Sequence, residues 1–161
     1  MKRSFLLLLM TCAFAITSAQ HLAFMGIPMG QPLGIFSKSL KQKGFYREYS
    51  AISSVQEFTG DFWKFKNVHV FVASDNGLVF HVDVSTRKAY PLSTYNNLVN
   101  SFTQKYGKCT AKKGYTYTWK VKGGEIQTFY FDNKNISIAY EDRISSYYIR
   151  KYQKRNPIND L

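Results

Sequence analysis

The chain has 161 residues, of which 45% are hydrophobic and 17% aromatic, and its 22 Lys and Arg against 10 Asp and Glu give a formal charge of +12. This composition excludes a disordered or collagenous protein, and the length excludes an array of many domains. Apart from the N-terminal segment, no apolar run approaches the roughly 18 residues that a membrane-spanning helix needs. We therefore expect a basic, aromatic-rich globular protein.

The first 19 residues have the three parts of a secretory signal peptide. A short basic start is followed by an apolar stretch over residues 5–16 and by small residues at 17–19. We predict cleavage after Ala19 and export to the periplasm or the extracellular space. Cys12 follows bulky Met and Thr rather than the small residues of a lipobox, so lipidation is not expected.

The predicted mature chain, residues 20–161, loses two basic residues and no acidic one, which lowers its charge from +12 to +10. Cys109 is its single cysteine, so an internal disulfide is excluded. No Cys-His motif surrounds this residue, and we expect an inert thiol. Stability must then come from a hydrophobic core, which a chain of this length and aromatic content can build.

Two segments have the apolar spacing and the end signals of short amphipathic helices. The first begins near Pro32 and ends at Gly44, and the second begins near Pro91 and ends at Gly107. The two glycines are 63 positions apart, and strand-like sequence follows each helix. This repetition predicts a single compact domain made of two similar halves, at about 24–88 and 89–157.

Strands are expected at residues 47–58, 62–74 and 78–84 in the first half, and at 115–121, 126–131, 136–140 and 144–152 in the second. Thr59-Gly60-Asp61 is expected to turn between the first two strands, and Asn76-Gly77 is a strong hairpin signal. Short turns make neighbouring strands antiparallel, with each helix covering one sheet face and the other face partly open. The predicted fold is α+β, with two αβββ units; the alternative is one irregular sheet with two unrelated helices.

Turn and cap motifs are spread along the mature chain: FMGIPMG at 24–30, LKQKGF at 40–45, FTGDF at 58–62, KYG at 105–107 and INDL at 158–161. Together they resemble a family of uncharacterised secreted proteins of Bacteroides-type bacteria. The Gly-Ile-Pro start and the repeated helix also resemble the tandem-unit architecture of the beta-lactamase inhibitor protein-like fold. The resemblance implies this fold, an exported location and a role in binding other proteins, and it carries over no catalytic residue.

The sequence has none of the common catalytic motifs, such as a phosphate-binding loop, a nucleophile elbow, a zinc-protease helix or a metal-binding cysteine pair. Glu141 and Asp142 are adjacent, so in a strand they would point to opposite faces. Beside Arg143 they fit a charged turn better than a glycosidase pair. We therefore predict no catalytic residue and no cofactor.

His69 and His81 flank the predicted hairpin turn. With a regular register His69 would pair with Val84 and His81 with Val72, which places the two imidazoles on opposite faces of the sheet. We therefore predict no zinc or nickel site and interpret both as hydrogen-bonded structural residues. His21, just after the predicted cleavage site, is expected to be a mobile terminal residue.

Basic and aromatic side chains interleave near the C-terminus. The candidate partner-binding residues are Arg143, Tyr147, Tyr148, Arg150, Lys151, Tyr152, Lys154 and Arg155. Such a surface can bind a polyanion, a sugar or an acidic protein, and it can equally be a solvated sheet face. Tyr115, Tyr117 and Trp119 share one side of a predicted strand, and we expect them to pack beneath the second helix.

These features predict an exported, non-catalytic binding module that engages a protein or an anionic envelope or glycan ligand through an open basic, aromatic sheet face. Nucleic acid is not an expected partner, because the signal peptide directs the chain out of the cytoplasm and no recognition motif is present. Two alternatives remain open. One is a small envelope or glycan hydrolase, and the other is a structural subunit completed by pairing of an edge strand.

Overall fold

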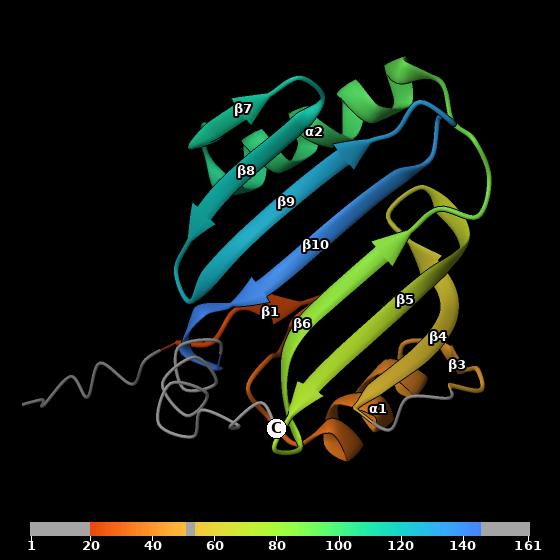
Figure 1. Cartoon of the computed structure of the whole chain (residues 1–161), viewed down its shortest axis with the longest axis vertical. Helices are drawn as coiled ribbons and strands as arrows, with labels where there is room; N and C mark the ends of the chain where they lie inside the picture. The colour runs from red at the N-terminus through yellow and green to blue at the C-terminus, as the bar shows by residue number, and fades with distance from the viewer. Residues whose placement is uncertain (1–19, 51–53, 146–161) are drawn as a thin grey trace, which may run out of the picture.

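The structure is a computed structural model that describes residues 20–50 and 54–145. Its centre is one eight-stranded sheet with the strand order β3-β4-β5-β6-β10-β9-β8-β7, and every neighbouring pair is antiparallel (Figure 1). A separate pair, β1-β2, lies near the start of the described chain. The prediction of an α+β fold with an antiparallel sheet is confirmed.

The two helices of the element order are α1 (Leu33–Gln42) and α2 (Leu92–Tyr106). The strands are β1 (Ala23–Phe24), β2 (Ile27–Pro28), β3 (Tyr46–Arg47), β4 (Val55–Phe62), β5 (Phe65–Asp75), β6 (Leu78–Ser85), β7 (Ala111–Lys113), β8 (Thr116–Val121), β9 (Gly124–Tyr130) and β10 (Ile136–Asp142). Within the described residues, no helix has the length and apolar content needed to cross a membrane.

Both helices begin and end where the sequence predicts. Each starts directly after a proline, at Pro32 or Pro91, which has no N–H to leave unsatisfied in the first turn. Just past the ends lie Gly44, with a φ of 88°, and Gly107, with a φ of 85°. Glycine takes these left-handed values without the steric cost of a Cβ, so the chain can turn back toward the sheet.

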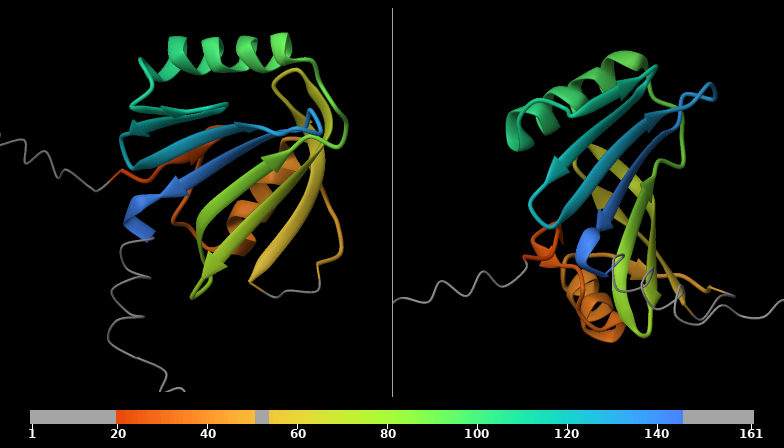
Figure 2. Two further views of the ribbon diagram at one scale, coloured as in Figure 1. Left: turned by 45° about the horizontal axis from the view of Figure 1, so that its top comes forward. Right: turned by 60° about the vertical axis from the view of Figure 1, so that its left-hand side comes forward.

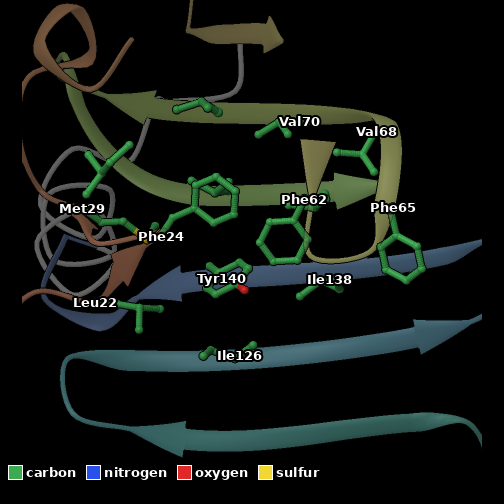
Figure 3. Packing of buried hydrophobic residues seen from close by; sticks show 14 of the residues in the cluster. Leu22, Phe24, Met29, Phe62, Phe65, Val68, Val70, Ile126, Ile138 and Tyr140 are labelled. Carbon is green, nitrogen blue, oxygen red and sulfur yellow. The ribbon is translucent and has the colours of Figure 1, made fainter. Parts of the chain in front are cut away.

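The two helices pack on the same face of the eight-stranded sheet (Figure 2). Helix α1 buries Phe36 and Leu40, and α2 buries Leu98 and Phe102, all in one hydrophobic cluster with the inward side chains of the strands. In Figure 3, Phe24 of β1 lies among the core side chains of the sheet. Its ring centroid is 5.5 Å from that of Phe62 and 5.2 Å from that of Tyr140.

The aromatic side of β8 lies beneath α2, as predicted. Trp119 is fully buried and meets Phe102 of α2 edge to face, with ring centroids 5.6 Å apart. Tyr117 is half-buried, and Tyr115, the turn residue directly before the strand, is 54% exposed. Tyr95 of α2 donates its hydroxyl hydrogen to backbone carbonyls of the sheet, and burial raises its pKa to about 12.

The predicted turn at Thr59-Gly60-Asp61 is wrong. These residues lie inside β4, and the chain turns at Trp63 and Lys64 instead. Gly60 serves packing, because a Cβ at this position would lie 2.4 Å from Cδ1 of Phe45. A glycine under an aromatic ring looks the same in sequence as a glycine in a turn. The sequence also missed the short edge strands β3 and β7.

The hairpin between β5 and β6 has the predicted turn but not the predicted register. Asn76 and Gly77 both have positive φ, at 48° and 77°, and Asp75 pairs with Leu78. Ser74 still pairs with Val79, but the register then shifts, so that Ala73 pairs with His81. Phe80 is thereby the extra residue of a β-bulge, which reverses the expected facing of every later residue in β6.

The N-terminal residues of the described chain are tied to the end of β10. Asp142 is fully buried, and its carboxylate accepts the N–H of Leu22 at 2.8 Å and the N–H of Ser145 at 3.0 Å. Nδ1 of His21 lies 2.9 Å from the same carboxylate. The expectation of a mobile His21 is therefore wrong, and Asp142 is a buried anchor rather than part of a charged turn.

The predicted C-terminal strand at 144–152 is wrong where it can be compared. Residues 143–145 form a short helical turn, and residues 146–152 lie outside the described part of the chain. Strands β8, β9 and β10 agree with the predicted segments to within two residues at each end. Cys109 is half-buried and packs against the core.

Candidate functional site on the open face of the sheet

We call the side of the eight-stranded sheet opposite the two helices the open face. Strand pairing places three rows of side chains across it, from β8 to β4. The first row is Lys120, Glu125, Glu141, His81, Ala73 and Val55. The second is Thr118, Gln127, Ala139, Asp83, Phe71 and Glu57, and the third is Thr116, Phe129, Ser137, Ser85, His69 and Thr59. Most of these side chains are half-buried.

Acidic side chains are concentrated on this face. Five of the ten acidic residues of the chain lie on it or at its β3 margin: Glu48, Glu57, Asp83, Glu125 and Glu141. Many basic residues lie instead at helix ends, on β7 or in turns: Lys41, Lys43, Lys105, Lys112, Lys122 and Lys134. Acidic side chains therefore predominate on the described part of the open face, whereas most of the residues on which the prediction of a basic face rests lie outside the described residues.

Glu125 and Glu141 are direct cross-strand partners on β9 and β10. Like charges placed opposite each other in an antiparallel pair destabilise it. Cations surround the pair: Lys120 is the neighbour of Glu125 on β8, and Nη2 of Arg143 lies 3.8 Å from its Oε2. This corner of the open face is suited to hold positive charge.

Asp83 lies one row away, on β6. Ser137 donates its hydroxyl hydrogen to Asp83 Oδ1 at 2.8 Å. Burial nevertheless raises the pKa of Asp83, while the Ser137 hydrogen bond and the charge of His81 act in the opposite direction. A partly desolvated carboxylate at the centre of the face costs stability whenever it is ionised.

At the β3 margin, Glu48 accepts hydrogen bonds from Thr59 and from Arg87, whose Nη2 also lies 2.6 Å from Thr59 Oγ1. The Thr59 hydrogen bond, followed by that from Arg87, lowers the pKa of Glu48. His69 is the cross-strand neighbour of Thr59. Its Nε2 is buried without a hydrogen-bond partner within the described residues, so the interpretation of His69 as a satisfied structural histidine is wrong at this atom.

The bulge at Phe80 brings His69 and His81 to the same face, contrary to the prediction. Four strand positions separate His69 from Ala73, the partner of His81, which corresponds to about 13 Å along the strand. That separation is too large for one shared ion. Over residues 20–50 and 54–145, no three His, Cys, Asp or Glu side chains are grouped closely enough to hold a metal.

The candidate partner-binding residues are only partly described. Arg143 is exposed and reaches toward Glu125. Tyr147, Tyr148, Arg150, Lys151, Tyr152, Lys154 and Arg155 lie outside the described residues. The place of Asp83 on the open face was missed, because the wrong hairpin register put it on the opposite side of the sheet. The spacing of Val79, Val82 and Val84 carried the missing signal, since these valines can share the core face only if one extra residue bulges between the first two.

Both edges of the sheet are short. β3 has two residues and β7 has three, including Lys112 and Lys113. Short edge strands that carry lysine are typical of edges that avoid pairing with another chain. Lys112 also lies over the ring of Tyr117, with Nζ 5.0 Å from the ring centroid.

Comparison with known protein families, curated proteins and solved structures finds no match.

Proposed function

We propose that this chain is an exported, non-catalytic module that binds a partner protein through the open face of its sheet. The observation that carries the proposal is the concentration of energetically unfavourable polar groups on this one face. They are the partly desolvated Asp83 and the Nε2 of His69, which is buried without a hydrogen-bond partner among the described residues. The carboxylates of Glu125 and Glu141, directly opposed on β9 and β10, add acidic charge to the same face. Groups that cost stability in the free protein are typical of functional surfaces, where a partner compensates them.

Apolar rings lie beside these polar groups. Phe129 in the third row stacks on Phe131, with centroids 6.2 Å apart, and Phe131 is 47% exposed. Phe71 lies in the second row, and its ring centroid is 5.7 Å from that of His69. Aromatic anchors among charged side chains are the usual composition of a protein-binding surface. The acidic charge favours a partner with a basic surface over an anionic lipid or glycan.

The order of the elements supports the tandem architecture that we propose for the fold. Helix α1 precedes β3, β4, β5 and β6, and α2 precedes β7, β8, β9 and β10. Each set of four strands is consecutive in the sheet, and the last strands of the two sets, β6 and β10, pair at the centre. We interpret the two sets as copies of one helix-plus-strands unit, related as in the beta-lactamase inhibitor protein-like fold that the sequence resembles.

Affinity capture from envelope extracts tests the function with a matched pair of variants. Gln127→Arg places a cation in the second row of the open face, and Gln104→Arg makes the same change on the exposed side of α2. We expect wild type and Gln104→Arg to retain one specific protein that Gln127→Arg loses, with the loss reproduced using purified components. Equal retention by all three, or turnover of a substrate that depends on one open-face carboxylate, would contradict the proposal.

A further inference from the structure

The carboxylates of the open face form a band that crosses neighbouring strands. Glu125 on β9 and Glu141 on β10 lie in the first row, and Asp83 on β6 and Glu57 on β4 lie in the second. Four strand spacings separate β9 from β4 in the sheet order, which corresponds to about 19 Å. A ligand that neutralises this band must be cationic and extended over several residues.

The described chain ends next to this band. Glu141 is the penultimate residue of β10, and the last described residue, Ser145, follows it by four positions and donates its N–H to Asp142. Sixteen residues follow, at 146–161, with four basic side chains and one acidic. The basic cluster is Arg150, Lys151, Lys154 and Arg155, and three tyrosines at 147, 148 and 152 accompany it.

We propose that this basic C-terminal segment, residues 146–161, binds the acidic open face of its own chain. The inference rests on the proposed function, since it adds an internal competitor for the same surface. The segment is long enough, because residue 150 can lie up to about 18 Å from Ser145 and residue 155 up to about 36 Å, against the 19 Å of the band. Tethering gives the segment an effective concentration in the millimolar range, so weak ion pairs suffice.

Charge provides the specificity of this contact. The positive side chains of the segment complement the negative charge of the opposed Glu125 and Glu141 and of the ionised form of Asp83. The basic residues that the sequence predicts to bind an anionic ligand would then bind the carboxylates of the open face in the same chain. A partner with a basic surface must displace the segment before it binds, so the half-buried carboxylates are available only to a partner that competes successfully with the segment.

Paramagnetic relaxation in the full-length chain tests the contact. A nitroxide is attached at Asn156→Cys in a Cys109→Ser background, and the amide signals of the ¹⁵N-labelled chain are recorded. We expect the amides of β6, β9 and β10 to lose most of their intensity at low salt and to recover it near 1 M NaCl, where the screening length is about 3 Å.

Variants at the two sides of the contact provide the controls. Replacing the four basic residues of the segment by Gln is expected to restore the signals without touching the folded core, as is Glu125→Gln with Glu141→Gln. The control, Asp132→Asn, removes an exposed acid outside the open face, in the β9–β10 turn, and should leave the broadening unchanged. Uniform broadening, absence of broadening, or broadening that survives neutralisation of the segment would overturn the inference.

A mixed sample of ¹⁵N-labelled chain without nitroxide and unlabelled chain with nitroxide separates the occupants. Broadening in that sample alone would assign the contact to a second copy and overturn the intramolecular form. The relaxation and capture experiments can fail independently. If the segment broadens the open-face signals but no partner protein is captured, the proposed function is refuted and this inference stands. If a partner is captured but no broadening is seen, this inference is refuted and the proposed function stands.

Discussion

Replacement of Asp142 by Ala is expected to destabilise the protein by roughly 2–6 kcal/mol. The buried carboxylate accepts two backbone N–H groups, of Leu22 at 2.8 Å and of Ser145 at 3.0 Å, from segments at opposite ends of the described chain. Each buried donor left without an acceptor costs about 1–3 kcal/mol. The contact of His21 with the same carboxylate lies closer to solvent and adds little to this sum.

Urea unfolding followed by tryptophan fluorescence measures the change, because Trp119 is fully buried in the native core. The control is Asp132→Ala in the exposed β9–β10 turn, which is expected to change the free energy of unfolding by less than about 0.5 kcal/mol. Asp142→Asn, which keeps an acceptor oxygen, should fall between the two. A loss for Asp142→Ala no larger than that of Asp132→Ala would refute the assignment of Asp142 as an anchor.

Three further outcomes follow from other contacts. Asp83→Asn should raise the free energy of unfolding at pH 7. Folding raises the pKa of Asp83, so ionisation of this carboxyl destabilises the folded protein as the pH rises from the usual aspartate range through the raised value. The gain should vanish near pH 3, where the carboxyl is protonated in both states, and a gain that persists there would contradict this explanation. Tyr95→Phe should cost about 1–3 kcal/mol in urea unfolding, since it removes the hydroxyl that donates to the Thr128 carbonyl; an unchanged midpoint would count against that bond. Gly60→Ala should lower the melting temperature by displacing the ring of Phe45, and an unaltered melting curve would show that the ring does not pack there.

Local chemistry made the helices and the hairpin turn predictable. Gly44, Gly107 and the Asn76-Gly77 pair act through their own backbone conformations, so their effects are visible in the sequence without any knowledge of distant contacts. The same holds for the alternation in β8, which places Trp119 in the core.

Features that depend on contacts distant in sequence were not predictable in this way. Gly60 was taken for a turn because its partner, the ring of Phe45, is 15 positions away in the chain. Asp142 was taken for a surface residue because its partner, the backbone of Leu22, comes from the start of the described chain. Neither contact leaves a local pattern of spacing or composition.

The open face was mispredicted for a different reason. One extra residue at Phe80 reverses the facing of the rest of β6, and the error separated His81 and Asp83 from the side chains of β5 that they accompany. Net charge added to the error, because a chain with +12 overall suggests a basic surface, whereas half of its acids gather on one face.

Site-specific photo-crosslinking in the producing cells tests the central claim, that the open face binds a partner. A photoreactive phenylalanine analogue is placed at Phe129, in the third row of the open face, or at Tyr115, an exposed aromatic in the turn between β7 and β8. We predict a discrete adduct with one other protein from Phe129 and none from Tyr115. An adduct from Tyr115 alone, or no adduct from Phe129 under conditions in which the capture experiment retains a partner, would contradict the account.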